Sequence, residues 1–146
     1  MLWNVILRPY WRYRLSRCFH WRDGDDPCWD HMKLGRWGER VAADYVRSRG
    51  ATLLYRNFRG PRGGEVDLVV RDGVQLCFVE VKTRRRRATG RPLDAVTLEK
   101  QELIERGARA WIRLLRQRDI LWRFDVVEVE LTEAEAPKLT WVKEAF

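Results

Sequence analysis

The chain has 146 residues, of which 45% are hydrophobic and 34% charged, a balance that suits one folded domain and excludes a disordered or fibrous protein. No apolar run approaches the roughly 20 residues of a membrane helix, and three cysteines exclude a disulfide-rich class, so we expect a cytoplasmic protein without a membrane partner. The formal net charge of +8 bears on partners and not on the fold.

The first 34 residues differ from the rest in composition. They hold four of the eight Trp residues and show neither a helical nor a strand period, so we expect residues 1–34 to form an irregular, Trp- and Arg-rich extension, disordered in one interpretation. Four potential zinc ligands lie there, Cys18, His20, Cys28 and His31, but their spacing matches no standard zinc finger. A contact surface for a partner protein is a further alternative.

The folded domain is expected over residues 35–146, and it begins with a helix over about 36–49. Trp37, Val41 and Tyr45 recur at helical spacing, and a glycine follows the last turn. Glu39 falls at the border of this apolar stripe.

The rest of the chain has the patterns of strands and one long helix. Alternating and β-branched runs predict strands at about residues 52–58, 65–71, 74–82, 121–131 and 139–142, with a Gly- and Pro-rich loop at 59–64. A long helix is expected over about 93–117, its inner side made by Val96, Leu103, Ile104, Trp111 and Leu115. The order α-β-β-β-α-β-β indicates an α/β fold.

Asp72 and Gly73 separate the second and third strands, and this dipeptide predicts a two-residue hairpin turn. With these residues as the turn, Phe78 pairs with Asp67 and Glu80 pairs with Glu65. Facing residues share a side of the sheet and neighbours alternate. One face is therefore predicted to carry Glu65, Asp67, Glu80 and Lys82, and the other to carry the core residues Leu68, Val70, Val79 and Val81.

Three carboxylates on one sheet face are costly without a cation, because like charges across a strand pair repel. In this register Asp67 and Glu80 are diagonal neighbours that can share an ion, and Mg²⁺ or Mn²⁺ suits carboxylate oxygens. Such an ion activates water for attack on a phosphate, and Lys82 is placed to assist. The alternative is a solvated sheet face with a Glu–Lys pair.

At these residues the sequence resembles a nuclease motif. Asp67, twelve residues and then Glu80-Val81-Lys82 is similar to the D-x(n)-E-x-K core of the PD-(D/E)-x-K nuclease superfamily, although Val66 stands where that motif has Pro. A wider set of blocks resembles the YraN-like family, uncharacterised predicted endonucleases that are similar to archaeal Holliday-junction resolvases. The blocks are Gly-Arg-Trp-Gly-Glu at 35–39, Gly-Glu-Val-Asp-Leu at 64–68, Phe-Val-Glu-Val-Lys-Thr-Arg at 78–84, Arg-Phe-Asp-Val-Val at 123–127, and Asn57, Lys100 and the final Ala145-Phe146.

The resemblance implies a restriction-endonuclease-like fold, a mixed central sheet flanked by helices. It implies that Glu39, Asp67, Glu80 and Lys82 are catalytic, and that Asp67 and Glu80 hold Mg²⁺ or Mn²⁺, with Glu65 as a third candidate ligand. The family usually begins shortly before the Gly-Arg-Trp-Gly-Glu block. One interpretation therefore places the native start at Met32, and the other treats residues 1–31 as a lineage-specific extension.

Arginine dominates the positive charge, with 24 Arg against 5 Lys, a bias that suits phosphate binding and also a GC-rich genome. Six residues at or after the predicted catalytic strand are expected to contact nucleic acid: Arg84, Arg85, Arg86, Arg87, Arg91 and Lys100. We therefore expect a metal-dependent endonuclease that acts on DNA rather than RNA, including branched DNA, for which a homodimer is a suitable assembly. The alternative is a nucleic-acid-binding module with this fold and little or no turnover.

Overall fold

The computed structural model describes residues 31–85, 96–117, 119–131 and 136–146. Along these residues the elements are α2 (His31–Ser48), β1 (Thr52–Arg59), β2 (Glu65–Asp72), β3 (Gln75–Arg85), α3 (Leu98–Leu115), β4 (Trp122–Leu131) and β5 (Lys138–Val142). The predicted order and the α/β class are confirmed. The predictions made for residues 1–30, which include three of the four candidate zinc ligands, and for Arg86, Arg87 and Arg91 lie outside the described residues.

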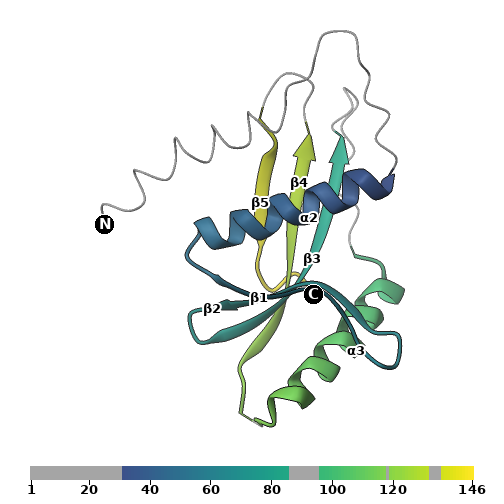
Figure 1. The fold of residues 1–146 in the computed structure, drawn as a ribbon, viewed down its shortest axis with the longest axis vertical. Coiled ribbons are helices and arrows are strands. Elements are labelled where there is room, and N and C mark those ends of the chain that lie inside the picture. Colours follow the sequence, from purple (N-terminus) through teal and green to yellow (C-terminus); the bar gives the residue numbers. More distant parts are fainter. Residues whose placement is uncertain (1–30, 86–95, 118, 132–135) are drawn as a thin grey trace.

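The five strands form one mixed sheet in the order β1-β2-β3-β4-β5. Neighbouring strands are antiparallel except β3 and β4, which run parallel. A parallel pair needs a crossover connection, and α3 lies in the segment that joins β3 to β4. Figure 1 shows α2 crossing one face of the sheet and α3 packed beneath its other face. Neither helix in the described part of the chain is long and apolar enough to cross a membrane.

Side chains that alternate along β2 and β3 build a core on each face. The core beneath α2 contains Leu68, Val70 and Val79, with Val81 packed against it, as predicted from the alternation. Trp37, Val41, Ala42 and Val46 cover it from α2. The core beneath α3 contains Val66, Val69, Phe78, Ile104 and Ala108. The face predicted to carry the charged residues is therefore apolar near the hairpin turn, at Val69 and Phe78. The charged residues lie at the end of the sheet away from that turn.

The hairpin turn lies one residue later than predicted. Asp72 pairs with Gln75, so the turn consists of Gly73 and Val74, with Gly73 at φ +60° in the first central position. Asp72 stays in the strand because its carboxylate binds Arg123 at 2.6 Å and Lys143 at 2.7 Å. The predicted pairings of Phe78 with Asp67 and of Glu80 with Glu65 are therefore wrong. Phe78 pairs with Val69, and the pairing of β2 with β3 ends at Leu68 and Val79. A shift of two in the sum of paired residue numbers leaves the predicted faces of the paired segments unchanged. Val66, which lies beyond them, packs in the core beneath α3, although Leu68 packs in the core beneath α2.

The helix starts also differ from the predictions. α2 begins at His31, about one turn before the expected start, and Leu34 is buried in the core beneath it. α3 begins at Leu98, because Thr97 is extended and its hydroxyl caps the helix by accepting the N–H of Lys100. Val96 is therefore a core residue before the helix, not within it. Leu115, predicted on the inner side of the helix, is 40% exposed at its C-terminal end.

A buried polar network joins the C-terminal segment to the sheet. Asp125 on β4 has no exposed surface, and its carboxylate accepts hydrogen bonds from Arg123, from the Trp141 indole at 2.8 Å and from the Glu144 backbone at 3.0 Å. Arg123 also donates to Asp72 and to Gln75. Asp125 and Arg123 therefore have partners from several elements, and these contacts fix the end of the sheet that contains the hairpin turn.

Candidate active site

The sheet forks at the end where the acidic residues lie. β2 and β3 are paired from the hairpin turn as far as Leu68 and Val79. Beyond that pair β2 continues with β1 alone, while β3 continues with β4 alone. Figure 1 shows β1 and β2 turning away from β3 at this point. Asp67 and Glu80 are the first residues past the last paired rung, one on each branch of the fork.

Asp67 bridges the two branches. Its Oδ2 accepts the backbone N–H of Val81 at 2.8 Å, in place of a strand-to-strand hydrogen bond. This contact turns the carboxylate of Asp67 toward Glu80. Glu80 is a buried acid with 8% of its surface exposed, and its Oε2 accepts no hydrogen bond from the described residues. Burial and then the charge of Asp67 raise the pKa of Glu80 from 4.5 to about 8.

Lys100 of α3 extends its side chain toward the carboxylates at the fork. Its ammonium lies 2.7 Å from Oε1 of Glu65 and 3.3 Å from Oε2 of Glu80. The hydrogen bond from Lys100 lowers the pKa of Glu65. Burial acts to lower the pKa of Lys100, but the three carboxylates outweigh it and the pKa is raised. The structure thus brings Glu65, Asp67 and Glu80 together around one ammonium group.

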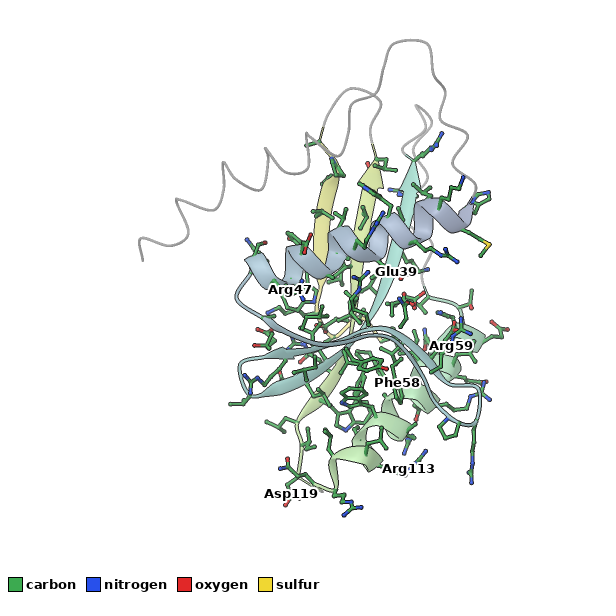
Figure 2. The ribbon with its side chains drawn as sticks, viewed as in Figure 1. Glu39, Arg47, Phe58, Arg59, Arg113 and Asp119 are labelled. Atoms are coloured by element: carbon green, nitrogen blue, oxygen red, sulfur yellow. The ribbon has the colours of Figure 1, made fainter. Side chains whose placement is uncertain are left out.

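Glu39 approaches the fork from the opposite helix. Figure 2 shows it on the side of α2 that faces β1 and β2. Burial raises the pKa of Glu39, a hydrogen bond from Asn57 acts against that rise, and the charge of Asp67 adds to it. Asn57 on β1 has φ +52°, an uncommon conformation for a residue other than Gly. The sequence pattern assigned Asn57 no role, because its contact with Glu39 exists only after β1 packs beside α2.

Glycines let both helices approach the charged end of the sheet closely. A Cβ atom on Gly38 of α2 would overlap the side chain of Thr83 on β3. A Cβ on Gly64 would overlap the backbone of Gly107 of α3, and a Cβ on Gly107 would lie 2.9 Å from Val66. These contacts hold α2 against β3 beside Glu39 and α3 against β2 beside Glu65. They therefore determine how far the helix side chains reach toward the fork.

The basic residues that were predicted to act on or bind nucleic acid differ in their exposure and in their contacts. Lys82 is half-buried on β3, two residues beyond Glu80 and on the same side of the strand. Arg84 forms an ion pair of 2.7 Å with Glu130 on β4, and Arg85 is exposed at the end of β3. Lys100 points inward to the carboxylates.

Three further arginines surround the site and were missed in the sequence. Arg56 and Arg36 act electrostatically on Glu39, and Arg59 acts on Glu65. All three are exposed. Arg59, on the edge strand β1, pairs with Glu65 of β2, and Figure 2 shows it near the start of α3. They are separated from the Glu80 strand in sequence, so only the fold reveals this positive rim.

The acidic pair fits a divalent cation. Within the described residues no group of three or more Asp, Glu, His or Cys side chains is arranged as a metal site. Mg²⁺, however, is commonly held by one or two carboxylates and keeps several waters. Asp67 and Glu80 supply hard oxygen donors, and Oε2 of Glu80 is buried without a hydrogen bond from the part of the chain that the structure describes. Glu65, the third predicted ligand, accepts a hydrogen bond from Lys100.

Comparison with known proteins gives one consistent family. The model of the uncharacterised protein family UPF0102 matches residues 38–129. A UPF0102 protein of Trichlorobacter lovleyi is 46% identical over 117 residues, which cover 80% of this chain and 91% of the relative. The UPF0102 protein GSU0650 of Geobacter sulfurreducens is 44% identical over 77% of this chain and 88% of its own length. A UPF0102 protein of Solibacter usitatus is 45% identical over 116 residues, which cover 77% of this chain and 84% of the relative.

Proposed function

The chain belongs to the uncharacterised protein family UPF0102, and we propose that it is a metal-dependent endonuclease that hydrolyses phosphodiester bonds of DNA, including branched DNA. The observation that carries the proposal is the pair of Asp67 and Glu80 on the two branches of the forked sheet. The buried Oε2 of Glu80 accepts no hydrogen bond from the described residues and lies 3.3 Å from the Lys100 ammonium. A restriction-endonuclease-like fold and kinship with PD-(D/E)-x-K nucleases belong to the same proposal. The spacing of Asp67, Glu80 and Lys82 on adjacent strands supports both.

Each side chain has a chemical task in this proposal. Asp67 and Glu80 would hold Mg²⁺ or Mn²⁺, which when bound acidifies water and stabilises negative charge on a phosphate. Lys82 presents an ammonium group on the same side of β3 as Glu80, where it orients the phosphate and offsets its charge. Burial raises the pKa of Glu39, which makes its carboxylate a better proton acceptor than an ordinary one.

The positive side chains supply the substrate contacts. Arg36, Arg56 and Arg59 lie around the carboxylates, and phosphates that approach the fork pass them. Arg85 and Lys82 extend the positive charge along β3. Duplex DNA is the favoured substrate, and a homodimer suits a two-fold branched substrate. The cytoplasm, where DNA is accessible in bacteria, is the proposed location.

Cleavage assays test the proposal directly. We expect the purified chain with Mg²⁺ or Mn²⁺ to cut at least one of linear duplex, nicked duplex and four-way-junction DNA. The Asp67→Asn and Lys82→Met variants should lose about 100-fold or more in rate while still binding DNA, because they remove groups that act on the reacting phosphate. Asp119→Asn is the matched control, since Asp119 is exposed and lies at the far end of the molecule (Figure 2).

Failure has a defined form. If the three DNA substrates and their RNA counterparts all remain intact with either ion, the endonuclease proposal is wrong. If the chain nevertheless binds DNA in a salt-dependent manner, and neither metal nor Asp67→Asn changes that binding, the alternative of a binding module without turnover is the correct interpretation.

A further inference from the structure

Lys100 is the residue whose position departs most from its predicted role of contacting nucleic acid. Its side chain is 26% exposed, and its ammonium group points to the carboxylates of Glu65 and Glu80. The contact with Glu80 at 3.3 Å involves Oε2, the same buried oxygen that accepts no hydrogen bond within residues 31–85, 96–117, 119–131 and 136–146. The positive charge therefore lies beside the oxygen that a divalent ion would use.

The backbone of Lys100 is held firmly, while its side chain is long. The N–H of Lys100 donates to the hydroxyl of Thr97 at 3.3 Å, which fixes the first turn of α3. Gly107 packs against the backbone of Glu65, which fixes the helix against β2. The ammonium sits at the end of a flexible four-carbon stem. It can leave the carboxylates by side-chain rotation without any shift of α3.

We propose that the ammonium of Lys100 is a resident counter-ion that occupies the place of the divalent cation between the branches of the fork and is displaced when that cation binds. The inference rests on the proposed function, since it concerns the same acidic pair. An ammonium and a divalent ion repel strongly when both lie against one buried oxygen. Cation binding must therefore break the contact with Glu80, and Lys100 weakens the affinity of the site for its ion.

Titration with Mn²⁺ tests this without any measurement of cleavage. We expect the full-length Lys100→Met variant, followed by calorimetry, to bind Mn²⁺ about 10-fold or more tightly than the unmodified chain. Lys100→Gln should behave like Lys100→Met and serves if the first variant does not fold. Lys100→Arg keeps the charge and should bind no more tightly than the unmodified chain.

Lys143→Met is the matched control. Lys143 forms an ion pair of the same length, 2.7 Å, but with Asp72 near the hairpin turn. Its removal should leave the Mn²⁺ affinity unchanged. The Asp67→Asn substitution, added to Lys100→Met, should abolish the tight binding, which locates the ion at the fork.

The outcomes separate this inference from the proposed function. Equal or weaker Mn²⁺ binding by Lys100→Met and Lys100→Gln overturns the counter-ion role while the cation site stands. No Mn²⁺ binding by the unmodified chain or by either neutral variant overturns the cation site and, with it, the metal-dependent mechanism. Tighter binding that survives Asp67→Asn places the ion elsewhere and also overturns the inference.

Discussion

Glu80 is held in surroundings that favour its neutral form. Burial and the neighbouring charge of Asp67 raise its pKa to about 8, above the ordinary value of 4.5. In the unfolded chain the carboxyl group ionises near its ordinary value. Protonation of Glu80 therefore favours the folded state fully below about pH 4.5, and this contribution is lost as the pH rises through about 8. The residue best suited to hold a cation thus costs stability at neutral pH when no cation is present.

The Glu80→Gln variant tests this cost. In buffer with a chelator, we expect it to be more stable than the unmodified chain by on the order of 1 to 3 kcal/mol at pH 8, because the neutral amide has no charge to desolvate. At pH 5 most of the gain should be lost, since Glu80 is then protonated in the native state and the pH is close to its ordinary pKa. Urea denaturation at both pH values measures the free energy of unfolding.

Glu105→Gln provides the comparison for that experiment. Glu105 lies on the outer side of α3, where its side chain is 44% exposed and pairs with Arg109. Its replacement should change stability by less than about 0.5 kcal/mol at either pH. A gain for Glu80→Gln that is the same at pH 5 and pH 8 would show that the carboxyl group is not the cause.

Residue types and spacing predicted part of this site. Asp67, Glu80 and Lys82 follow from a strand period of two, whereas Glu39 was assigned only by the resemblance to the nuclease family. Asn57 and Arg56 could not be predicted in the same way, because they meet Glu39 only through the packing of β1 beside α2.

At the level of elements, close helix-to-strand contact positions the side chains. Gly38, the residue before Glu39 in α2, packs against Thr83 of β3. Gly38→Ala should reduce the free energy of unfolding by about 1 to 3 kcal/mol, because the added methyl group overlaps Thr83 and forces α2 outward. We also expect reduced cleavage, since Glu39 moves with the helix. Urea denaturation and the cleavage assay measure the two effects.

Gly35→Ala is the control for helix propensity. Gly35 belongs to the same helix, and a Cβ atom there would meet nothing within 4 Å. Ala should stabilise α2 at this position by about 0.5 to 1 kcal/mol. In the Gly38→Ala background, Thr83→Ala should recover part of the lost stability because it removes two of the overlapping atoms. Equal effects of the two glycine substitutions would contradict the close-contact explanation.

The order of elements was predictable because each segment has its own period, but their pairing was only partly so. The hairpin was expected at residues 72–73, and ion pairs of Asp72 with Arg123 and Lys143 keep Asp72 in the strand. Those partners lie 51 and 71 residues away, beyond the reach of local turn preferences. The fork was not predicted either: β3 stays paired with β4 along its whole length, whereas its pairing with β2 ends at Val79.

At the level of the whole molecule, the basic groups behind the net charge of +8 differ in how far each can attract a nucleic acid. Some described basic groups are already neutralised by partners, such as Arg123 by Asp125 and Arg84 by Glu130. Arg56 and Arg59 are exposed on the edge strand β1 and flank the carboxylates. The positive charge that matters for a nucleic acid is therefore expected to be local to the fork, and not the sum over the chain.

Salt dependence of DNA binding distinguishes local from diffuse charge. If the phosphates contact the rim, the Arg56→Gln/Arg59→Gln double variant should lower the slope of log association constant against log salt by about 2. Arg47→Gln/Arg113→Gln removes the same net charge at the far ends of α2 and α3 (Figure 2) and should leave the slope unchanged. Equal losses in the two variants would mean that DNA responds to the total charge, and the arginine bias would then have no bearing on the position of the active site.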